Sequence, residues 1–381
     1  MRLGILIYSL SGGGAERVVS YLLTHCISKE IDVHLIMMNT GVNYDIPKST
    51  RIHYIENSNP NEHGVIKALK IPFLAYKYAR LVKKLELTHS LSFLTRPSFI
   101  NVLSRFFTSY KFKVITNERA FPTLQYSYKG FQSWFNKKMI KSLYKKSEAV
   151  ISNSNGNAND LISNFKVPSD KMYVIHNPID LDKISDINPK EDFFDATKFN
   201  IITIGRLDIG KNHKMIINAI NKLNNTNIHL YIIGSGPMQS ELEDLVEKLN
   251  LKNQVFLLGY QANPYGYLKS ANLFAFGSNH EGFPNVLLEA MACNIPIIST
   301  NCQSGPSEIL KLQNDKSDDI MITDYGILTP VKNDEAMAKG ISHFLDNKSF
   351  TEKCKINGLK RIKDFDKEKI LNQYIDLVGA V

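Results

Sequence analysis

The segment from Ile201 to Lys211 reads IITIGRLDIGK, an apolar, β-branched run that ends in glycine and is followed at once by Arg206. This pattern predicts a buried strand that turns sharply into a loop. Two similar segments follow: YIIGSGP, from Tyr231 to Pro237, and VFLLGY, from Val255 to Tyr260. Strands and helical segments alternate from Phe199 to Asn301, which requires a parallel sheet. This half of the chain is therefore predicted to form one doubly wound α/β domain.

Arg206 and Lys211 place two cations on the loop that follows the first of these strands. Ligands of open α/β sheets bind beyond the carboxyl ends of the strands. A planar guanidinium and a mobile ammonium suit a diphosphate whose charge is balanced without a metal ion. Taken alone, the two side chains fit a solvated surface loop better than a ligand site. Gly205, Gly236 and Gly259 at neighbouring strand ends favour the ligand-binding interpretation, because glycine lets the backbone approach a ligand closely.

A second pattern lies in residues 277 to 309, GSNHEGFPNVLLEAMACNIPIISTNCQSGPSEI, where seven residues separate Glu281 from Glu289. A turn rich in glycine and proline is predicted to lead into a helix from Asn285 to Cys293. The N-terminal N–H groups of such a helix can hold an anion. Glu281 would lie beside that anion, and Glu289 would accept hydrogen bonds from hydroxyl groups of the same ligand. The alternative is a buried helix with one capping glutamate near its start.

Together these motifs resemble the retaining glycosyltransferases of family 4, which carry a Gly-Arg…Lys loop and a Glu-x7-Glu signature. The resemblance is strongest from Gly205 to Glu308 and reaches the N-terminal half through its Gly-rich start. It implies the α/β GT-B fold, in which two Rossmann-like doubly wound domains face a cleft. Residues 1–177 are expected to bind the acceptor and residues 178–363 the nucleotide sugar. The last helix, about residues 364–381, is expected to pack back on the N-terminal domain.

The same resemblance implies roles for individual residues. Glu281 would contact the donor sugar and Glu289 the ribose hydroxyls, while Arg206 and Lys211 would bind the diphosphate and support its departure. Glu281, Arg206 and Lys211 are thus the expected catalytic residues. The other expected donor-binding positions are Gly205, Gly236, Leu258, Gly259, Tyr260, Gly282, Phe283, Pro284, Asn285 and Val286. Residues 282–286 would cradle the phosphate or sugar, and residues 258–260 would pack on the base.

The N-terminal half begins with a comparable pattern. A strand is predicted from Leu3 to Tyr8, a glycine loop from Gly12 to Gly14, a helix from Ala15 to Ile27 and a strand from Ile31 to Asn39. The loop lacks the spaced G-x-G-x-x-G order, and no acidic residue ends the second strand, which disfavours a dinucleotide site. By resemblance, Gly13 and Gly14 would face the cleft near the donor phosphates and the acceptor.

The segment VITNERAFP, from Val114 to Pro122, places Asn117, Glu118 and Arg119 after another predicted strand. These three residues are expected to emerge into a loop and to face the acceptor. Many relatives in the resembling family have a histidine in this loop that contacts the donor sugar, whereas this sequence has Arg119 at the matching position. A plain ion pair between Glu118 and Arg119 is an equally good interpretation.

The domains are predicted to be linked near VIHNPID, Val174 to Asp180, because Asn-Pro disfavours a continued helix. Two amphipathic helices, Lys332 to Asp346 and Thr351 to Leu377, are predicted to follow near the end of the chain. The 381 residues exceed the usual limit for one core, which agrees with two domains. The four cysteines are scattered without a C-x2-C pair, which is typical of reduced structural thiols. No Asp-x-Asp motif follows a strand near the phosphate loops, so neither a metal nor a cofactor is expected.

The basic charge is concentrated in residues 61 to 150, which hold 17 Lys and Arg against 4 Asp and Glu, whereas the remaining chain is net acidic. Aromatic residues are interleaved with these cations from Phe73 to Leu85 and from Tyr126 to Lys146. Each Lys or Arg near an anionic leaflet contributes roughly 1 kcal/mol, and aromatic rings anchor at the headgroup level. The pattern predicts contact with an anionic membrane surface. Solvated helix faces are the alternative, and a nucleic-acid surface is disfavoured because no reader motif accompanies the charge.

Neither a signal-peptide pattern at the start nor an uninterrupted run of about 18 apolar residues is found, so a cytoplasmic enzyme peripheral on the inner face of the cell membrane is expected. The run CQSGPSEIL, Cys302 to Leu310, resembles enzymes that build bacterial surface polysaccharides from UDP-hexoses or UDP-N-acetylhexosamines. The expected acceptor is a glycan on a polyprenyl diphosphate. GDP-mannose is the alternative donor, and a nucleotide-sugar epimerase of similar two-domain shape is the alternative from another class.

Overall fold

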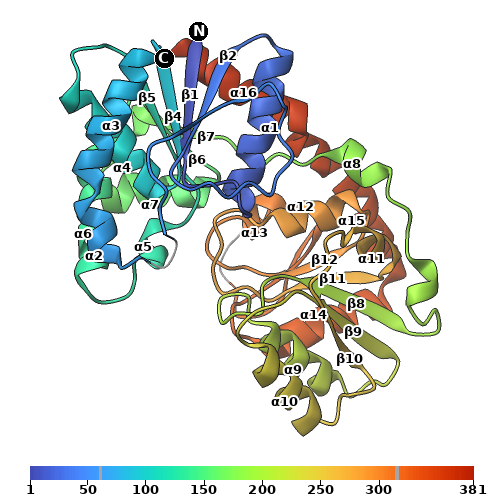
Figure 1. The fold of residues 1–381 in the computed structure, drawn as a ribbon. Helices are drawn as coiled ribbons and strands as arrows, with labels where there is room; N and C mark the ends of the chain where they lie inside the picture. The colour runs from blue at the N-terminus through green and yellow to red at the C-terminus, as the bar shows by residue number, and fades with distance from the viewer. Residues whose placement is uncertain (60–61, 314–316) are drawn as a thin grey trace. The chain divides into compact units, whose positions relative to one another are not determined.

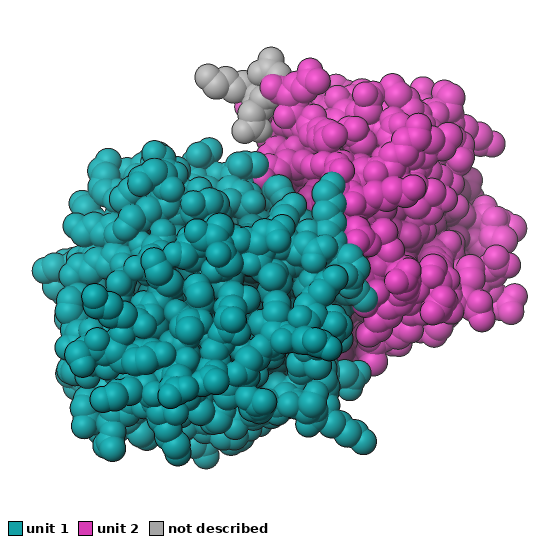
Figure 2. Space-filling view, turned by 90° about the horizontal axis from the view of Figure 1, so that it is seen from above, with its two compact units in different colours: residues 1–178, 367–381 teal, residues 179–366 magenta. Residues whose placement is uncertain are grey.

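The computed structural model describes residues 1–59, 62–313 and 317–381. The chain forms two compact units, coloured separately in Figure 2. Unit 1 comprises Met1–Pro178 and Lys367–Val381, and unit 2 comprises Ile179–Asp366. The chain thus enters unit 2 next to the Asn-Pro turn of the predicted linker, and its last helix belongs to unit 1.

Unit 1 is built on a seven-stranded parallel sheet in the order β3-β2-β1-β4-β5-β6-β7 (Figure 1). The strands are β1 (Arg2–Ile7), β2 (Asp32–Met37), β3 (Arg51–Tyr54), β4 (His89–Phe93), β5 (Lys113–Glu118), β6 (Ala149–Ser152) and β7 (Met172–Val174). Most of these strands are buried apolar runs, as expected when helices cover both faces of a parallel sheet.

The helices of unit 1 cover both faces of this sheet. One face packs against α1 (Gly14–Ser28) and the C-terminal α16 (Lys367–Ala380) through residues such as Ile5, Ile7 and Tyr374. The other face packs against α3 (Ile71–Lys84), α4 (Thr95–Ser104), α6 (Phe131–Leu143) and α7 (Asn155–Phe165) through residues such as Leu6 and Tyr78. The short helices α2 (Gly64–Leu69), η1 (Arg105–Phe107) and α5 (Pro122–Gln125) lie between these elements in sequence.

Unit 2 repeats the architecture with strands in the order β10-β9-β8-β11-β12-β14-β13. They are β8 (Phe199–Ile204), β9 (Ile228–Ile233), β10 (Val255–Gly259), β11 (Leu273–Phe276), β12 (Ile297–Thr300), β13 (Met321–Thr323) and β14 (Gly326–Thr329). The pairs from β8 to β12 are parallel, as predicted, and the β13–β14 pair is antiparallel. One face packs on α9 (His213–Leu223), α10 (Gln239–Lys248) and α14 (Asp334–Asp346), and the other on α8 (Leu181–Ser185), α11 (Tyr265–Ser270) and α12 (Asn285–Ala292).

The single helix predicted from Thr351 to Leu377 is wrong. The structure has α15 (Lys348–Arg361), a 3-10 turn from Ile362 to Phe365, and then α16. Asp366 between them is extended (φ −52°, ψ 138°), and the Ile179 N–H donates to Phe365 O at 2.9 Å. The break lies where the chain passes from unit 2 to unit 1, so the packing of two separate cores interrupts an otherwise helical sequence.

None of the helices formed by the described residues has the length and apolar character needed to span a bilayer. The four cysteines are buried and unpaired. Burial raises the pKa of each thiol to about 12, which keeps them protonated and unreactive at neutral pH.

Candidate functional site

The strand order of unit 2 reverses between β8 and β11, which lie side by side at the centre of its sheet. The loop after β8 carries Arg206 and Lys211, and the loop after β11 carries Glu281. Two loops that leave a doubly wound sheet in this way frame the crevice in which such sheets bind ligands. Residues 70 positions apart in sequence therefore meet at one place.

Lys211 and Glu281 form the centre of this site. Lys211 Nζ lies 2.5 Å from Glu281 Oε1, and the two side chains are 28% and 14% exposed. The Ser278 hydroxyl donates to the same carboxylate oxygen at 2.7 Å. The ammonium also lies 5.5 Å from the centre of the Phe276 ring. The carboxylate is thus held by two donors and remains partly exposed to solvent.

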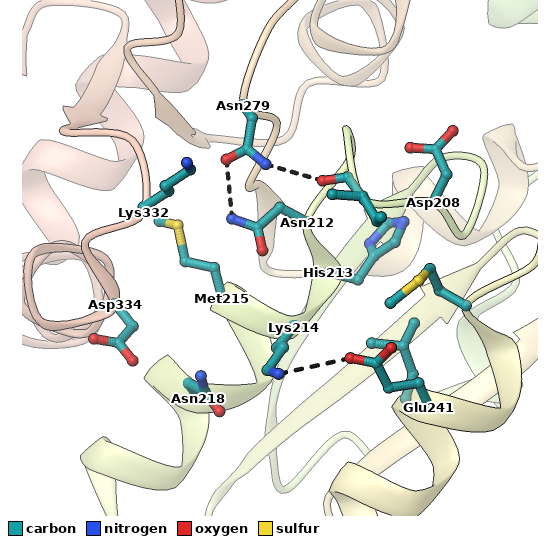
Figure 3. Close-up of a pocket in the computed structure, with 13 residues that line it drawn as sticks. Asp208, Asn212, His213, Lys214, Met215, Asn218, Glu241, Asn279, Lys332 and Asp334 are labelled. Carbon is teal, nitrogen blue, oxygen red and sulfur yellow. Dashed lines mark hydrogen bonds and ion pairs between the residues drawn. The ribbon is translucent and has the colours of Figure 1, made fainter. Parts of the chain in front are cut away.

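Further hydrogen bonds tie the two loops together. The Asn279 N–H donates to Gly210 O at 2.8 Å, and its side-chain amide donates to Ile209 O at 2.9 Å. Asn212 Nδ2 donates to Asn279 Oδ1 at 3.2 Å (Figure 3). The Lys211 N–H donates to Asp208 Oδ1 at 3.0 Å. These bonds hold the loop in a defined shape, whereas the Arg206 side chain is 72% exposed and its Nε lies 4.0 Å from Asp208 Oδ2.

Glycine is required where the loop after β9 passes the loop after β8. A Cβ atom on Gly234 would lie 1.9 Å from Gly205 O, and one on Gly236 would lie 2.4 Å from Leu207 O. Gly234 also has φ +147°, and Gly259 at the end of β10 has φ +68°. Gly234 and Gly236 thus let these two loops approach each other closely, and the expected approach of Gly205, Gly236 and Gly259 to a ligand stays a prediction.

The predicted helix after Glu281 begins at Asn285 and ends at Ala292, one residue earlier than expected. Pro284 precedes its first turn, and Val286 is partly buried in that turn. Glu289 is only 6% exposed. The Phe283 ring packs 5.6 Å from that of Phe365 in the core.

The remaining predicted donor-binding residues lie around this turn and at the end of β10. Gly282 O accepts from the Ser304 hydroxyl at 2.8 Å. Leu258 is half-buried in β10, while Tyr260, directly after it, is 72% exposed. An exposed ring beyond a strand end suits stacking on a base.

The sequence interpretation missed His213, which begins α9 beneath the Gly205–Lys211 loop. Burial lowers its pKa to about 4, so the ring is neutral at physiological pH. The nearby backbone of Gly205 and Arg206 offsets part of this shift, and neither ring nitrogen makes a hydrogen bond to a residue that the structure describes. A neutral imidazole under the cationic loop supports the loop without adding charge. Its position two residues after Lys211 was the only signal that the sequence offered.

A cavity of about 430 Å³ lies on the flank of the same loop (Figure 3). Its lining includes Asp208, Asn212, Lys214, Glu241 and Asn279. The Lys214–Glu241 ion pair, 3.6 Å long, crosses it. Arg206, Lys211, Glu281 and Glu289 are not among the described residues that line this cavity, so it is a neighbour of the candidate site.

In unit 1, Gly13 precedes α1 with φ +130°, and Gly14 is the first residue of that helix. The Tyr44 hydroxyl donates to Gly13 O at 2.8 Å. Glu16 in the first turn lies near Arg119, whose charge opposes the burial that raises the pKa of Glu16. The glycine loop and the end of β5 are thus neighbours.

The expectation that residues 117–119 emerge into a loop is wrong for Asn117 and Glu118, which end β5, and is confirmed for Arg119, which follows the strand. Asn117 and Glu118 are the last residues of β5 and are 0% and 1% exposed, and Arg119 is 8% exposed. The Asn117 amide and the Arg119 guanidinium both donate to the hydroxyl of Tyr374, at 2.9 and 3.2 Å. Burial under α16, far away in sequence, explains why the local pattern was misleading.

The alternative of an ion pair between Glu118 and Arg119 also fails. The hydroxyls of Tyr144 and Thr95 donate to Glu118 Oε2 at 2.6 and 3.0 Å. The Arg119 guanidinium instead donates to Asn177 and Tyr374. Burial raises the pKa of the Glu118 carboxyl, which these hydroxyl donors partly offset. Within the described residues, no three His, Cys, Asp or Glu side chains are grouped so that they could hold a metal ion.

The two halves of the chain match known protein families. Residues 12–183 match the family described as Glycosyltransferase Family 4, and residues 185–361 match Glycosyl transferases group 1. The chain is 40% identical, over 97% of its own length and 97% of the relative, to the N-acetylgalactosamine-N,N'-diacetylbacillosaminyl-diphospho-undecaprenol 4-alpha-N-acetylgalactosaminyltransferase of Campylobacter jejuni. It is 25% identical to a second α-1,4-N-acetyl-D-galactosaminyltransferase of that organism, over 100% of this chain and 99% of the relative.

Solved structures agree on the fold. Anabaena Alr3699/HepE, crystallised with UDP, superposes with a TM-score of 0.82 at 17% identity and covers 100% of both chains. The lipopolysaccharide outer core galactosyltransferase WaaB gives a TM-score of 0.76 at 16% identity, over 100% of this chain and 99% of the other. From these matches and its two Rossmann-like units, the chain belongs to the family 4 and group 1 glycosyltransferases, is a transferase enzyme and has the GT-B fold.

Proposed function

We propose that the protein transfers N-acetylgalactosamine, with retention of anomeric configuration, from a UDP-sugar to a glycan carried on a polyprenyl diphosphate. The Lys211–Glu281 pair at the reversal of strand order in unit 2 carries this proposal. The sugar and the acceptor class are supported by the 40% identical relative, whose name states both over nearly the full length of the two chains. The choice of UDP follows the resemblance of the Cys302–Leu310 run to enzymes that use UDP-sugars.

The charges around the Lys211–Glu281 pair fit a nucleotide-diphosphate sugar. Glu281 neutralises Lys211, so an arriving diphosphate would compete for the ammonium and release the carboxylate toward the sugar hydroxyls. The exposed Arg206 guanidinium would close on the phosphates as a bidentate donor. The N-terminus of α12 would add its partial positive charge. In this proposal Glu289 accepts from the ribose hydroxyls and Tyr260 stacks on the base.

The transfer step needs no protein base. The bond between the anomeric carbon and the β-phosphate oxygen breaks, and the acceptor oxygen forms its bond to the anomeric carbon on the same face. The departing phosphate oxygen takes the proton of the acceptor hydroxyl, and Lys211 and Arg206 stabilise the negative charge that develops on the diphosphate. Neither a metal nor a cofactor takes part in this scheme.

The test is transfer by the purified protein to a short-chain polyprenyl-diphosphate-linked disaccharide. The donors to compare are UDP-GalNAc, UDP-GlcNAc, UDP-glucose and GDP-mannose, with product anomers read by NMR. An α-linked GalNAc product from UDP-GalNAc is expected. Transfer from GDP-mannose alone would replace the proposed donor, and a β-linked product would overturn retention. Conversion of a UDP-sugar in the absence of acceptor would indicate an epimerase.

We also propose that the enzyme works on an anionic membrane surface through unit 1. The exposed face of α3 and η1 presents Phe73, Tyr76 and Phe106, which are 62%, 43% and 63% exposed. Cations accompany the rings: Lys77 Nζ lies 5.5 Å from the Phe73 ring, and Lys146 Nζ lies 4.7 Å from the Phe106 ring. Paired aromatic and cationic side chains suit the headgroup region of an anionic leaflet. A lipid-linked acceptor would be reached from that position.

A further inference from the structure

Unit 1 has its own reversal of strand order, between β1 and β4. A cavity of about 420 Å³ lies just beyond the carboxyl ends of these two strands. Tyr8 directly follows β1, and Thr95 and Arg96 open α4 directly after β4, and all three line the cavity. Ligands of doubly wound sheets bind at such a reversal. The described residues that line this cavity all belong to unit 1, whereas the residues of the proposed donor site belong to unit 2.

The lining combines three kinds of side chain. Aromatic rings, among them Phe131 and Tyr128, form one wall, and amides such as Gln132 lie beside them. Two cations, Lys67 and Arg96, also line the cavity, and the described lining residues include no Asp or Glu. Rings pack on the C–H face of a sugar, amides pair with hydroxyl or N-acetyl groups, and guanidinium and ammonium groups donate to a phosphate. The lining therefore matches a phosphorylated saccharide.

Arg96 is oriented by its neighbours and retains an unused donor. Its Nη2 lies 3.2 Å from Glu56 Oε2, and its Nη1 donates to the Ser58 hydroxyl at 3.1 Å. Its Nε is buried and makes no hydrogen bond to any residue that the structure describes. Glu56 is shared, because Lys70 Nζ lies 3.3 Å from its other oxygen. A buried guanidinium donor without a partner is costly unless a ligand satisfies it.

The floor and walls of the cavity are built before any ligand arrives. The Tyr126 hydroxyl donates to Thr95 Oγ1 at 3.0 Å, and Thr95 donates to the buried Glu118 at 3.0 Å. A Cβ atom on Gly64 would lie 2.5 Å from Gln132 Oε1. The Gln132 side chain thus lies directly against the start of α2. Hydrogen bonds that hold Tyr126 and Thr95 in place reduce the entropic cost of binding.

We propose that this cavity binds the sugar–phosphate portion of the acceptor, with a sugar ring against Phe131 and Tyr128 and a phosphate against Arg96 and Lys67. This inference rests on the proposed function, since it names the part of the lipid-linked glycan that unit 1 recognises. The headgroup of an anionic phospholipid is a second source of phosphate. A headgroup without a sugar ring would leave the aromatic and amide walls unused.

The first experiment measures transfer to a short-chain prenyl-diphosphate disaccharide in detergent, at saturating donor. Arg96→Gln is expected to raise the KM for this acceptor about tenfold while kcat stays within about twofold, because one charge-assisted hydrogen bond is lost. Arg51→Gln is the matched control, since Arg51 is a 62% exposed arginine of the same unit on β3 and outside this cavity. Phe131→Ala, at a 56% exposed site, repeats the test independently of the Glu56 ion pair.

The second experiment measures binding without donor, by saturation-transfer NMR. The probes are the prenyl-diphosphate disaccharide, the same disaccharide without its diphosphate, and glycerol phosphate. The wild type should bind the first most tightly, and Arg96→Gln should remove the advantage of the diphosphate. The inference would be overturned if Arg96→Gln and Phe131→Ala both kept the wild-type affinity and the wild-type KM for the prenyl-diphosphate disaccharide. It would also be overturned if glycerol phosphate bound as tightly as that disaccharide. If no nucleotide sugar supported transfer, the proposed function would be overturned instead. The binding data would still show whether this cavity binds the sugar–phosphate portion.

Discussion

Lys211 Nζ and Glu281 Oε1, on loops that follow two adjacent strands of unit 2, lie 2.5 Å apart. The two charges neutralise each other, and both side chains are partly exposed. A bound diphosphate would replace Glu281 as the partner of the Lys211 ammonium, and the Glu281 carboxylate would then accept from the sugar hydroxyls. The chemistry proposed for unit 2 depends on this exchange.

Lys211→Met should therefore lower kcat by roughly 100-fold to 1000-fold, because it removes a cation from the departing diphosphate. Glu281→Gln keeps the shape and should lower kcat/KM for the sugar donor while UDP alone still binds. The measurement is steady-state kinetics together with UDP titration. Because the two groups act as a unit, the double variant should lose far less than the product of the single losses. Additive losses would contradict this coupling.

Gly236→Ala should lower the melting temperature by several degrees and weaken UDP binding. Its Cβ would lie 2.4 Å from Leu207 O, so the loop that carries Arg206 and Lys211 must move. Differential scanning calorimetry with and without UDP measures both effects. Gly379→Ala is the control, because a Cβ there meets no atom within 4 Å and alanine favours a helix. A Gly236→Ala protein with unchanged UDP affinity would show that this approach does not shape the site.

Membrane binding should depend on the exposed rings of unit 1. Phe73→Ser combined with Phe106→Ser is expected to reduce co-sedimentation with phosphatidylglycerol vesicles several-fold, and added salt should weaken the wild type further. Ile356→Ser removes a 56% exposed apolar side chain from unit 2 and serves as the control. The proposed surface would be contradicted if both variants lost the same fraction of vesicle binding, or if the wild type bound neutral and anionic vesicles equally well.

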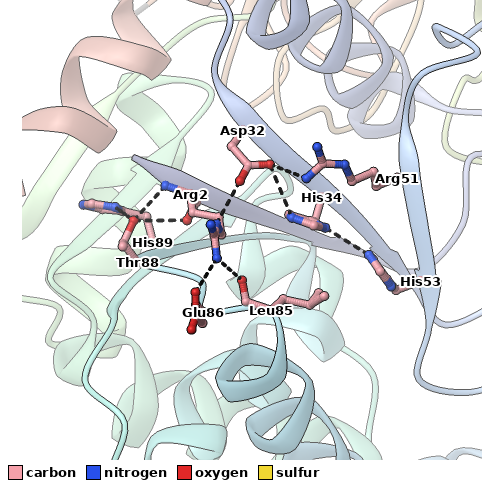
Figure 4. A network of polar contacts seen from close by, with 9 residues as sticks. All are labelled: Arg2, Asp32, His34, Arg51, His53, Leu85, Glu86, Thr88 and His89. Carbon is pink, nitrogen blue, oxygen red and sulfur yellow. Dashed lines mark hydrogen bonds and ion pairs between the residues drawn. The ribbon is translucent and has the colours of Figure 1, made fainter.

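Stability should fall as the pH drops from 7 toward 4. His34 Nδ1 and His53 Nε2 lie 3.0 Å apart beside Asp32 at the edge of unit 1 (Figure 4). Burial lowers the pKa of both rings, as it lowers that of His213 to about 4. A histidine whose pKa is lower in the folded state contributes stability above about pH 6.5, and that contribution is lost as the pH falls through the folded pKa.

For His213 this linkage is on the order of 3 kcal/mol, because its pKa is lowered from 6.5 to about 4 and the ring is buried. Melting temperatures between pH 7.5 and pH 4 measure the effect, and His213→Gln should flatten the curve. A melting temperature that rises on acidification would contradict the sign of these shifts.

Local patterns in the sequence were sufficient for the architecture and for part of the site. Glycine marks the ends of β8 and β10 because the chain turns sharply there, which is a local requirement. The start of α12 at Asn285 follows from the preceding Gly-Phe-Pro turn. The basic, aromatic character of α3 and α6 was likewise visible in composition. Such features depend on neighbours within one turn or strand.

The errors lie where distant segments decide the outcome. Asn117, Glu118 and Arg119 look like a loop in sequence, yet Tyr374 of the last helix covers two of them and Thr95 and Tyr144 satisfy the third. The helix predicted from Thr351 to Leu377 is divided because its two halves pack on different cores. Burial by a remote element has no local signature.

The sequence by itself determined that this chain forms two doubly wound α/β units, because strand ends, glycine turns and residue spacing are local properties. Its resemblance to the family 4 glycosyltransferases indicated Arg206, Lys211, Glu281 and Glu289 as candidate site residues. Only the tertiary structure decided that Lys211 and Glu281 form an ion pair. It also decided that Arg96, with a buried Nε that has no hydrogen-bond partner, lines the same cavity as Phe131. Those relationships arise from the order in which the strands pair, which joins residues far apart in the chain.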